Sequence, residues 1–409
     1  MDWIYLDNNA TTQPAPEVVE AMAGVHESLW ANPSSVHRFG QLVRHRVELA
    51  RAAVAKLIGC RDREVVFTSG GTESNNLALR GVLGVSAAPG SRRSGSLRPG
   101  VLITTKIEHT AIREPAEDIA DAGVKLVHVP VDRDGRVDPD RFAPTLAEHA
   151  TKDGRTLVSI QWANNETGVI QPIDRLVALC REYQHSSGIR VIFHCDATQA
   201  VGKVPVDVKQ AGVDLLTLSA HKFHGPKGVG VLYIRSGVRV RAQQRGGPQE
   251  RELRGGTENT AAIIGLGVGA DLARRFLEDR DQIDRLAAMR DRFEAAILDA
   301  LPDTQVHSRT AANGRLWTTS NLGFPRLEAE AILLALSEKG VCASAGAACS
   351  SGSLDPSPVL LAMGVPEPVA HGSVRFSIGR FSTEDQIDQA ITIVPQVVRK
   401  LRTTLPVQV

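Results

Sequence analysis

Short apolar runs alternate with segments of helical apolar spacing up to about Gly265, and this alternation constrains the fold more than any other feature. The expected helices include residues 44–58, which end at Gly59, and residues 72–80. Strands that are apolar throughout, and therefore buried on both faces, are typical of a parallel sheet with helical crossovers. We therefore expect an α/β fold in which helices sandwich a mostly parallel sheet. The expected strands span residues 64–68, 101–105, 124–129, 157–160, 191–193, 215–218 and 229–234.

The pattern changes after about Gly265, where a more helical region begins. A chain of 409 residues is also too long for one ordinary hydrophobic core. We predict a large domain, residues 15–262, and a smaller α+β domain formed by residues 1–14 together with 263–409. The expected elements of the smaller domain are helices over 270–301 (with a break near Glu278-Asp279), 328–337 and 384–401, and a strand over 317–322.

Composition and charge exclude several classes of function. Lys and Arg number 47 against 46 Asp and Glu, a formal net charge of +1, whereas nucleic-acid-binding proteins usually carry a basic excess. No apolar run approaches the ~18 residues expected of a membrane span. The N-terminal MDWIYLDNNATT lacks the basic and apolar regions of a signal peptide. We therefore expect a cytoplasmic protein that binds neither nucleic acid nor membranes.

The cysteine pattern argues against structural disulfides and against a thiolate zinc site, because the cysteines are odd in number and form no CxxC pair. His194, His221 and His224 lack the closed Cys/His set or the carboxylate-rich helix of a metal centre, so we predict no metal. The cysteines are Cys60, Cys180, Cys195, Cys342 and Cys349.

Three motifs follow predicted strands, and open α/β sheets bind ligands at the carboxyl ends of their strands. TSGGTES (68–74) is a glycine turn that leads into a helix, whose free backbone N–H groups and dipole suit a phosphate. Asp196 ends the strand in HCDATQ, and Lys222 follows a strand closely in SAHKFHGPKG. A lysine beside buried positions indicates a chemical role, since desolvation lowers the pKa of an amine.

Together the three motifs predict a site for pyridoxal phosphate. Lys222 would form the Schiff base, and Asp196 would hold the pyridinium nitrogen protonated, which makes the ring an electron sink. The turn at Thr72, with Ser219 and His221, would hold the phosphate.

Ten motifs, in order along nearly the whole chain, resemble those of cysteine desulfurases. These are fold type I pyridoxal-phosphate enzymes of the class V aminotransferase superfamily. The ACSSGS stretch resembles the first desulfurase group, whose nucleophile lies on a longer loop. The motifs are YLDNNATT (5–12), ANPSSVHRFG (31–40), FTSGGTESNN (67–76), IEHTAI (107–112), NNETG (164–168), HCDATQ (194–199), SAHKFHGPKG (219–228), RGGTEN (254–259), ACSSGSLDPS (348–357) and VRFSIGR (374–380).

The resemblance implies a role for each matching residue of the cofactor site. Lys222 would be both the Schiff-base lysine and the base for the substrate Cα proton, Asp196 would pair with the ring nitrogen, and His109 would stack on the ring. The other implied cofactor residues are Gln199 and Asn165 near the ring hydroxyl oxygen, Gly71, Thr72, Ser219 and His221 at the phosphate, and Thr257 at the phosphate of the partner subunit in a homodimer.

The resemblance also implies how substrate is bound and attacked. Arg375 would bind the substrate carboxylate, a fork-to-carboxylate pairing that lysine could not copy, and Asn32 would help there. Cys349 would be the nucleophile, because its neighbours are small and lack the apolar side chains that would bury it. We interpret the other four cysteines as small buried side chains.

The implied reaction is desulfuration of L-cysteine to L-alanine, with a persulfide formed on Cys349. The sulfur would pass to an acceptor such as an iron–sulfur scaffold or a tRNA thiolation protein. Alternatives are a selenocysteine lyase, a class V aminotransferase-like enzyme and a non-catalytic partner protein on the same scaffold. Cys349 argues against the aminotransferase, and the presence of Lys222, Asp196, His109 and Arg375 argues against the non-catalytic protein.

Overall fold

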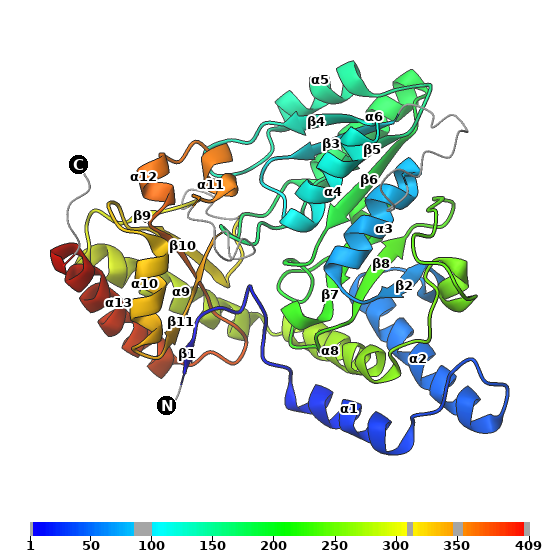
Figure 1. Ribbon diagram of the computed structural model, residues 1–409, viewed down its shortest axis with the longest axis horizontal. Helices are drawn as coiled ribbons and strands as arrows, with labels where there is room; N and C mark the ends of the chain where they lie inside the picture. The colour runs from blue at the N-terminus through cyan, green and yellow to red at the C-terminus, as the bar shows by residue number, and fades with distance from the viewer. Residues whose placement is uncertain (1–2, 86–99, 309–313, 347–354, 405–409) are drawn as a thin grey trace.

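The largest sheet in the described part of the chain is formed by seven strands in the order β2-β8-β7-β6-β5-β3-β4. This is seen in a computed structural model, which describes residues 3–85, 100–308, 314–346 and 355–404 (Figure 1). The strands are β2 (Val65–Thr68), β3 (Val101–Thr105), β4 (Lys125–Val129), β5 (Thr156–Ser159), β6 (Val191–Asp196), β7 (Leu215–Ser219) and β8 (Gly230–Ile234).

The sheet is mostly parallel, as predicted, and β8 is the exception. It runs antiparallel to both β7 and β2, with Ser219 opposite Gly230. The connection from β7 to β8 is too short for a crossover helix and holds only the 3-10 turn Ala220–Lys222, so the chain reverses there. Gly230 lets the neighbouring turn approach, because a Cβ on it would lie 2.7 Å from Cα of Gly70.

Helices cover both faces of this sheet, and successive strand residues pack on opposite faces. Phe67 packs in a core with Val47 of α2, whereas its neighbour Val66 packs with Leu79 of α3 on the other side. The helices of this part are α1 (Pro16–Ser28), α2 (Arg38–Leu57), α3 (Gly71–Leu83), α4 (Thr110–Asp121), α5 (Pro139–His149), α6 (Ile173–Ser187), α7 (Val208–Ala211) and α8 (Thr260–Glu278).

The smaller part is built on an antiparallel sheet of four strands, in the order β12-β13-β10-β9, and a parallel pair β1-β11. Its core includes Ile4 and Leu6 from the N-terminal segment. Figure 1 shows β1 and α13, the first and last described elements, in this part of the molecule. Its elements are β1 (Ile4–Tyr5), α9 (Arg280–Ala300), β9 (Gln305–Val306), β10 (Thr319–Gly323), α10 (Ala329–Ser337), β11 (Val341–Cys342), β12 (Ser344–Ala345), α11 (Pro358–Ala362), α12 (Glu367–Ala370), β13 (Ser373–Ser377) and α13 (Glu384–Thr404).

Helix α8 links the two parts. It starts at Thr260, ten residues before the expected helical stretch, because the Asn259 side chain caps it by accepting from the N–H of Ala262 at 3.2 Å. Gly267 packs it against α2, where a Cβ would lie 2.7 Å from Cα of Ala50. Helix α8 packs in the core of the larger sheet. The predicted domain boundary after residue 262 therefore depends on the part to which this helix is assigned, and the boundary stays a prediction. No helix in the described part of the chain is long and apolar enough to cross a membrane.

Candidate active site

A cavity of about 320 Å³ lies at the carboxyl ends of the parallel strands, where the two parts of the molecule meet. Its walls come from the residues after β3, β5, β6 and β7, from the N-terminal segment at Asn9 and Ala10, and from β13. Most of the residues singled out from the sequence line it: Gly71, Thr72, His109, Asn165, Asp196, Gln199, Ser219, His221, Lys222 and Arg375.

Lys222 reaches the cavity from the 3-10 turn after β7. Its amine donates hydrogen bonds to the backbone carbonyl oxygens of Asn9 at 2.7 Å and Ala10 at 2.8 Å. Two backbone acceptors from a segment more than two hundred residues away in sequence therefore fix the position of the amine.

Asp196 ends β6 with both carboxylate oxygens occupied. Oδ2 accepts from Nδ2 of Asn75 at 2.7 Å, and Oδ1 accepts from the backbone N–H of Thr198 at 3.0 Å. Asn75 was missed from the sequence as a site residue, although it stands in the FTSGGTESNN motif on the first turns of α3.

The part of the cavity next to the start of α3 suits an anion. Gly71 and Thr72 begin α3 directly after β2, so backbone N–H groups of the first helical turn face this part of the cavity. His221 contacts Oγ1 of Thr11 through Nδ1 at 3.1 Å. Burial, followed by the charges of Lys222 and Lys227, lowers the pKa of His221 to about 4, so its ring is neutral at pH 7.

Arg375 brings a cation from β13 to the third side of the cavity. Its guanidinium donates to Oδ1 of Asp7 at 2.9 Å and to the backbone oxygen of Asn165 at 3.0 Å. The side chain is only 4% exposed. A guanidinium held in this way can pair with a small carboxylate that enters the cavity.

His109 begins α4 on the same rim. Its Nδ1 accepts from the backbone N–H of Ala111 at 3.1 Å, which fixes the ring as the N-cap of the helix. The preceding residue, Glu108, was missed from the sequence. Its carboxyl is fully buried and accepts from the backbone N–H of Gln161 and from the Thr105 hydroxyl. Burial raises the pKa of Glu108 to about 8.

Four residues that line the cavity carry a buried polar atom without a hydrogen-bond partner in the described part of the chain. These atoms are Oδ1 of Asn75, Oδ1 of Asn165, Oγ1 of Thr198 and Nε of Arg375. Buried polar atoms are normally satisfied, so their clustering here indicates a cavity shaped for a polar ligand. An amine, a fixed carboxylate and a helix N-terminus around one cavity fit the aldehyde, the ring nitrogen and the phosphate of pyridoxal phosphate.

Two predicted site residues, Asn32 and Thr257, do not line this cavity. Asn32 is exposed. Thr257 lines a separate cavity of about 180 Å³, together with Ser69 and Arg254. Cys349 lies outside the described residues, and Gly346, the last described residue before it, lines the main cavity. Within residues 3–85, 100–308, 314–346 and 355–404 no group of three or more His, Cys, Asp or Glu side chains could hold a metal ion.

The chain belongs to the class-V aminotransferase family, which matches residues 4–390, and enzymes of this family depend on pyridoxal phosphate. Cysteine desulfurase 2 of Trichormus variabilis (strain ATCC 29413 / PCC 7937) is 45% identical over 407 residues, covering 99% of this chain and 96% of that protein. Among solved structures, a NifS-like protein superimposes with a TM-score of 0.86 at 32% identity, covering 98% of this chain and 100% of that one. A structure of SspA in complex with cysteine matches with a TM-score of 0.75 at 29% identity, covering 93% of this chain and 99% of that one.

Proposed function

We propose that this protein is a pyridoxal-phosphate-dependent cysteine desulfurase, which converts L-cysteine to L-alanine and transfers the sulfur through a persulfide on Cys349. The observation that carries the proposal is the convergence of Lys222, Asp196 and Arg375 on one cavity. The chain is also similar over nearly its whole length to a named cysteine desulfurase.

Lys222, Asp196 and Arg375 each have a definite task in this reaction. Pyridoxal phosphate, when bound, supplies an electron sink for the bond changes at the substrate Cα. Lys222 holds the cofactor and then moves the Cα proton, and its position is set by the Asn9 and Ala10 carbonyls. Asp196 binds the ring nitrogen, and Arg375 binds the substrate carboxylate beside the same cavity.

The described thiols are poor candidates for the nucleophile. Burial raises the pKa of Cys60 and of Cys180 to about 12, and it also raises the pKa values of Cys195 and Cys342. A thiolate is the reactive form, so these four residues are protonated at neutral pH. Cys349 is the remaining cysteine.

Sulfur transfer then balances without an added oxidant or reductant. The Cys349 thiolate attacks the sulfur of cysteine, a new S–S bond forms, and the Cβ–S bond breaks with its electron pair left on the carbon side. Protonation of the carbon skeleton gives alanine, and the enzyme keeps the persulfide.

We further propose a homodimer that delivers sulfur to an acceptor protein in a reducing cytoplasm. Thr257 lies in a cavity apart from the cofactor cavity of its own chain, which supports a role for it in the partner's site. The four described cysteines are free thiols, which supports a reducing compartment. An iron–sulfur scaffold and a tRNA thiolation protein are the two acceptors to be compared.

The direct test combines product analysis with cofactor mapping. The purified protein, given L-cysteine and a reductant, should release alanine and sulfide in equal amounts. Borohydride reduction followed by digestion should place the cofactor on the peptide that contains Lys222, and Lys222→Ala should show neither linkage nor turnover. Much faster turnover of selenocysteine would indicate a selenocysteine lyase, and keto-acid products with amino-group transfer would indicate an aminotransferase.

A further inference from the structure

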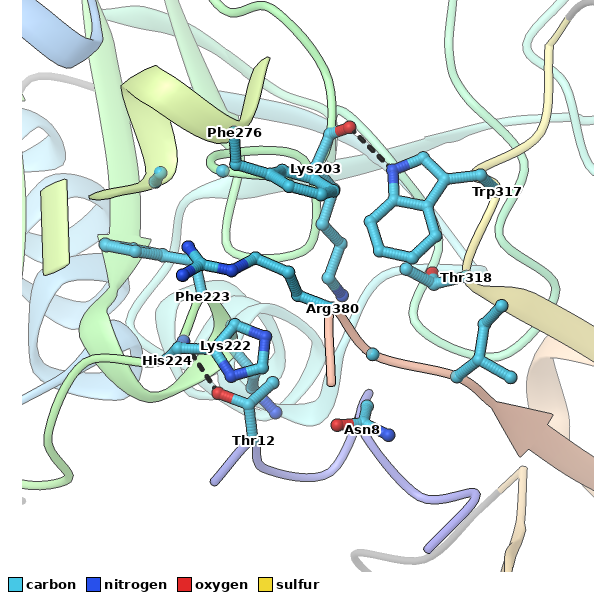
Figure 2. A pocket seen from close by; sticks show the side chains of 14 residues that line it. Asn8, Thr12, Lys203, Lys222, Phe223, His224, Phe276, Trp317, Thr318 and Arg380 are labelled. Carbon is cyan, nitrogen blue, oxygen red and sulfur yellow. Dashed lines mark hydrogen bonds between the residues drawn. The ribbon is translucent and has the colours of Figure 1, made fainter. Parts of the chain in front are cut away.

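Lys203 is a buried lysine beside the cofactor cavity that the proposed mechanism does not use. Its residue is 4% exposed, and it lies on the turn after β6, four residues beyond Gln199. It lines a small cavity behind Lys222 that also includes Arg380 and Trp317. Figure 2 shows its side chain inside this cavity, while its backbone oxygen accepts from Nε1 of Trp317 at 2.9 Å.

The Lys203 amine binds two side-chain carbonyl oxygens. It donates to Oδ1 of Asn9 at 3.0 Å and to Oε1 of Gln199 at 2.5 Å. No carboxylate in the described part of the chain forms an ion pair with it. Two amide carbonyls are therefore the partners of this amine.

These two hydrogen bonds fix how both amides are oriented. A lysine amine offers donors to both carbonyls, so each must turn its oxygen toward Lys203. The N–H₂ group of Gln199 then donates to the backbone oxygen of Asn9 at 2.9 Å. That oxygen also accepts from the Lys222 amine at 2.7 Å. One buried amine thus organises the groups around the linkage lysine.

The orientation of Gln199 has a chemical consequence for the cavity that it lines. Its oxygen faces Lys203 and one N–H donates to the Asn9 backbone oxygen, so Gln199 offers its remaining N–H to a bound group. A ligand atom that faces Gln199 must therefore accept a hydrogen bond, as a ring oxygen anion does. A flipped amide would instead present an oxygen and repel such an anion.

We propose that Lys203 is a positioning residue of the cofactor site, which fixes the Asn9 and Gln199 amides so that Gln199 presents an N–H donor to an anionic oxygen of the cofactor. The inference rests on the proposed function only in that Lys222 carries the cofactor.

The electrostatic surroundings of Lys203 are cationic. Burial, followed by the charges of Lys222 and Arg375, lowers the pKa of the Lys203 amine well below its usual range. His221 and His224, which also face it, are neutral at pH 7, since burial above all lowers the pKa of each to about 4. Arg380 lines the same small cavity. A test must therefore separate amide orientation from simple loss of a positive charge.

The measurement is the pH midpoint of the visible absorption band of the holoenzyme, which reports protonation at the Lys222 linkage. Lys203→Met removes the donors, and the Gln199 N–H group is no longer held toward the anion. The linkage nitrogen then becomes more basic, and the midpoint should rise by about one pH unit, the equivalent of one hydrogen bond to a charged group. A side chain that only fills space would leave the midpoint unchanged.

Two further variants test whether the shift of the midpoint depends on the Gln199 amide or only on the loss of a positive charge. Gln199→Leu removes the amide, so adding Lys203→Met to it should produce no further shift. Arg380→Met removes a cation from the same cavity, and the structure gives Arg380 no hydrogen bond to either amide. It should leave the midpoint in place. If Lys203→Met does not fold, Lys203→Leu, which also lacks donors, replaces it in the same cycle.

The outcomes decide between the possibilities. An unshifted midpoint in folded Lys203→Met, a shift that persists in the Gln199→Leu background, or an equal shift in Arg380→Met would each overturn the assignment. Failure of the wild-type protein to carry cofactor on Lys222 would instead overturn the proposed function and this inference with it, a result that the wild-type control alone reveals.

Discussion

Nδ2 of Asn75 donates a 2.7 Å hydrogen bond to Oδ2 of Asp196 and so joins α3 to the end of β6. The same helix begins at Gly71, where its N-terminus faces the part of the cavity that suits an anion. One rigid helix therefore sets the spacing between the Asp196 carboxylate, which we propose binds the ring nitrogen, and the proposed phosphate site.

Asn75→Ala should weaken cofactor binding without unfolding the protein. The substitution leaves Oδ2 of the buried Asp196 without its donor, and a lost hydrogen bond to a charged group is worth ~1.5–3 kcal/mol, or more than tenfold in affinity. Titration of the apoprotein with pyridoxal phosphate, followed by absorbance, measures the effect. Asn76→Ala is the matched control, because the Asn76 side chain donates to the backbone oxygen of Thr72 instead. Equal losses in the two variants would contradict the prediction.

Much of the fold was visible in the sequence because its elements are local patterns. The helix expected at 44–58 is α2, which starts six residues earlier at Arg38, where the His37 ring accepts from the N–H of Gly40 and caps the helix. The break expected near Glu278-Asp279 separates α8 from α9, with Asp279 as the N-cap of the second helix. The antiparallel course of β8 was not predicted, since strand direction depends on pairing partners and not on local spacing.

The site was predictable where motifs follow strands, and less so where contacts are distant. Asp196 ends β6 and Lys222 closely follows β7, and both line the cavity. Lys203, Asn75 and Asn9 act through hydrogen bonds to residues far away in sequence, so their roles appear only when the chain is folded.

Arg375→Lys should weaken substrate binding more than it slows chemistry. Lysine keeps the positive charge but cannot reproduce the fork that now spans Asp7 and the Asn165 carbonyl. We expect KM for L-cysteine to rise roughly tenfold or more, with a smaller change in kcat, because ground-state and transition-state binding are lost together. The cofactor linkage at Lys222 should survive. A variant with unchanged KM would remove Arg375 from the substrate site.

The buried carboxyl of Glu108 should make stability depend on pH. Its pKa is about 8 in the folded protein and 4.5 in the reference state, so the folded protein retains a proton that the unfolded chain loses. Stability from this group is complete below the lower value and falls by about 1.4 kcal/mol per pH unit as pH rises toward 8. Glu108→Gln, a neutral isostere, does not lose this stability. The melting temperature of Glu108→Gln should therefore rise relative to that of wild type as the pH is raised from 5 to 8.

The control for this prediction is Glu114→Gln, at an exposed position of the helix α4 that follows Glu108. It should track wild type at every pH. A constant difference between Glu108→Gln and wild type across this range would show that the Glu108 carboxyl does not retain its proton.

Glu250→Gln should destabilise the protein strongly. The Glu250 carboxylate forms two 2.8 Å bonds to the Arg51 guanidinium and accepts from the backbone N–H of Phe67, and both ion-pair side chains are nearly fully buried. Removing the Glu250 charge leaves the buried Arg51 guanidinium with only the half-exposed Glu48 as an ion-pair partner, at a cost of up to ~3–5 kcal/mol. Denaturant unfolding measures the change, with exposed Glu252→Gln as the control. Similar midpoints for the two variants would argue against a structural role for the ion pair.

Cys349→Ser should separate sulfur transfer from cofactor chemistry. Exchange of the substrate Cα proton requires only Lys222 and the bound cofactor, so it should continue at close to the wild-type rate. Persulfide formation should cease, because a serine hydroxyl is not a thiolate and cannot hold a sulfane sulfur. Mass spectrometry after brief exposure to L-cysteine should find one added sulfur on the peptide containing Cys349 in wild type and none in the variant. Serine at Cys60, Cys180, Cys195 or Cys342, whose thiols have raised pKa values, should retain sulfur transfer. Sulfur mapped to Cys342, or alanine formed at the native rate by Cys349→Ser, would mean that another group accepts or expels the sulfur.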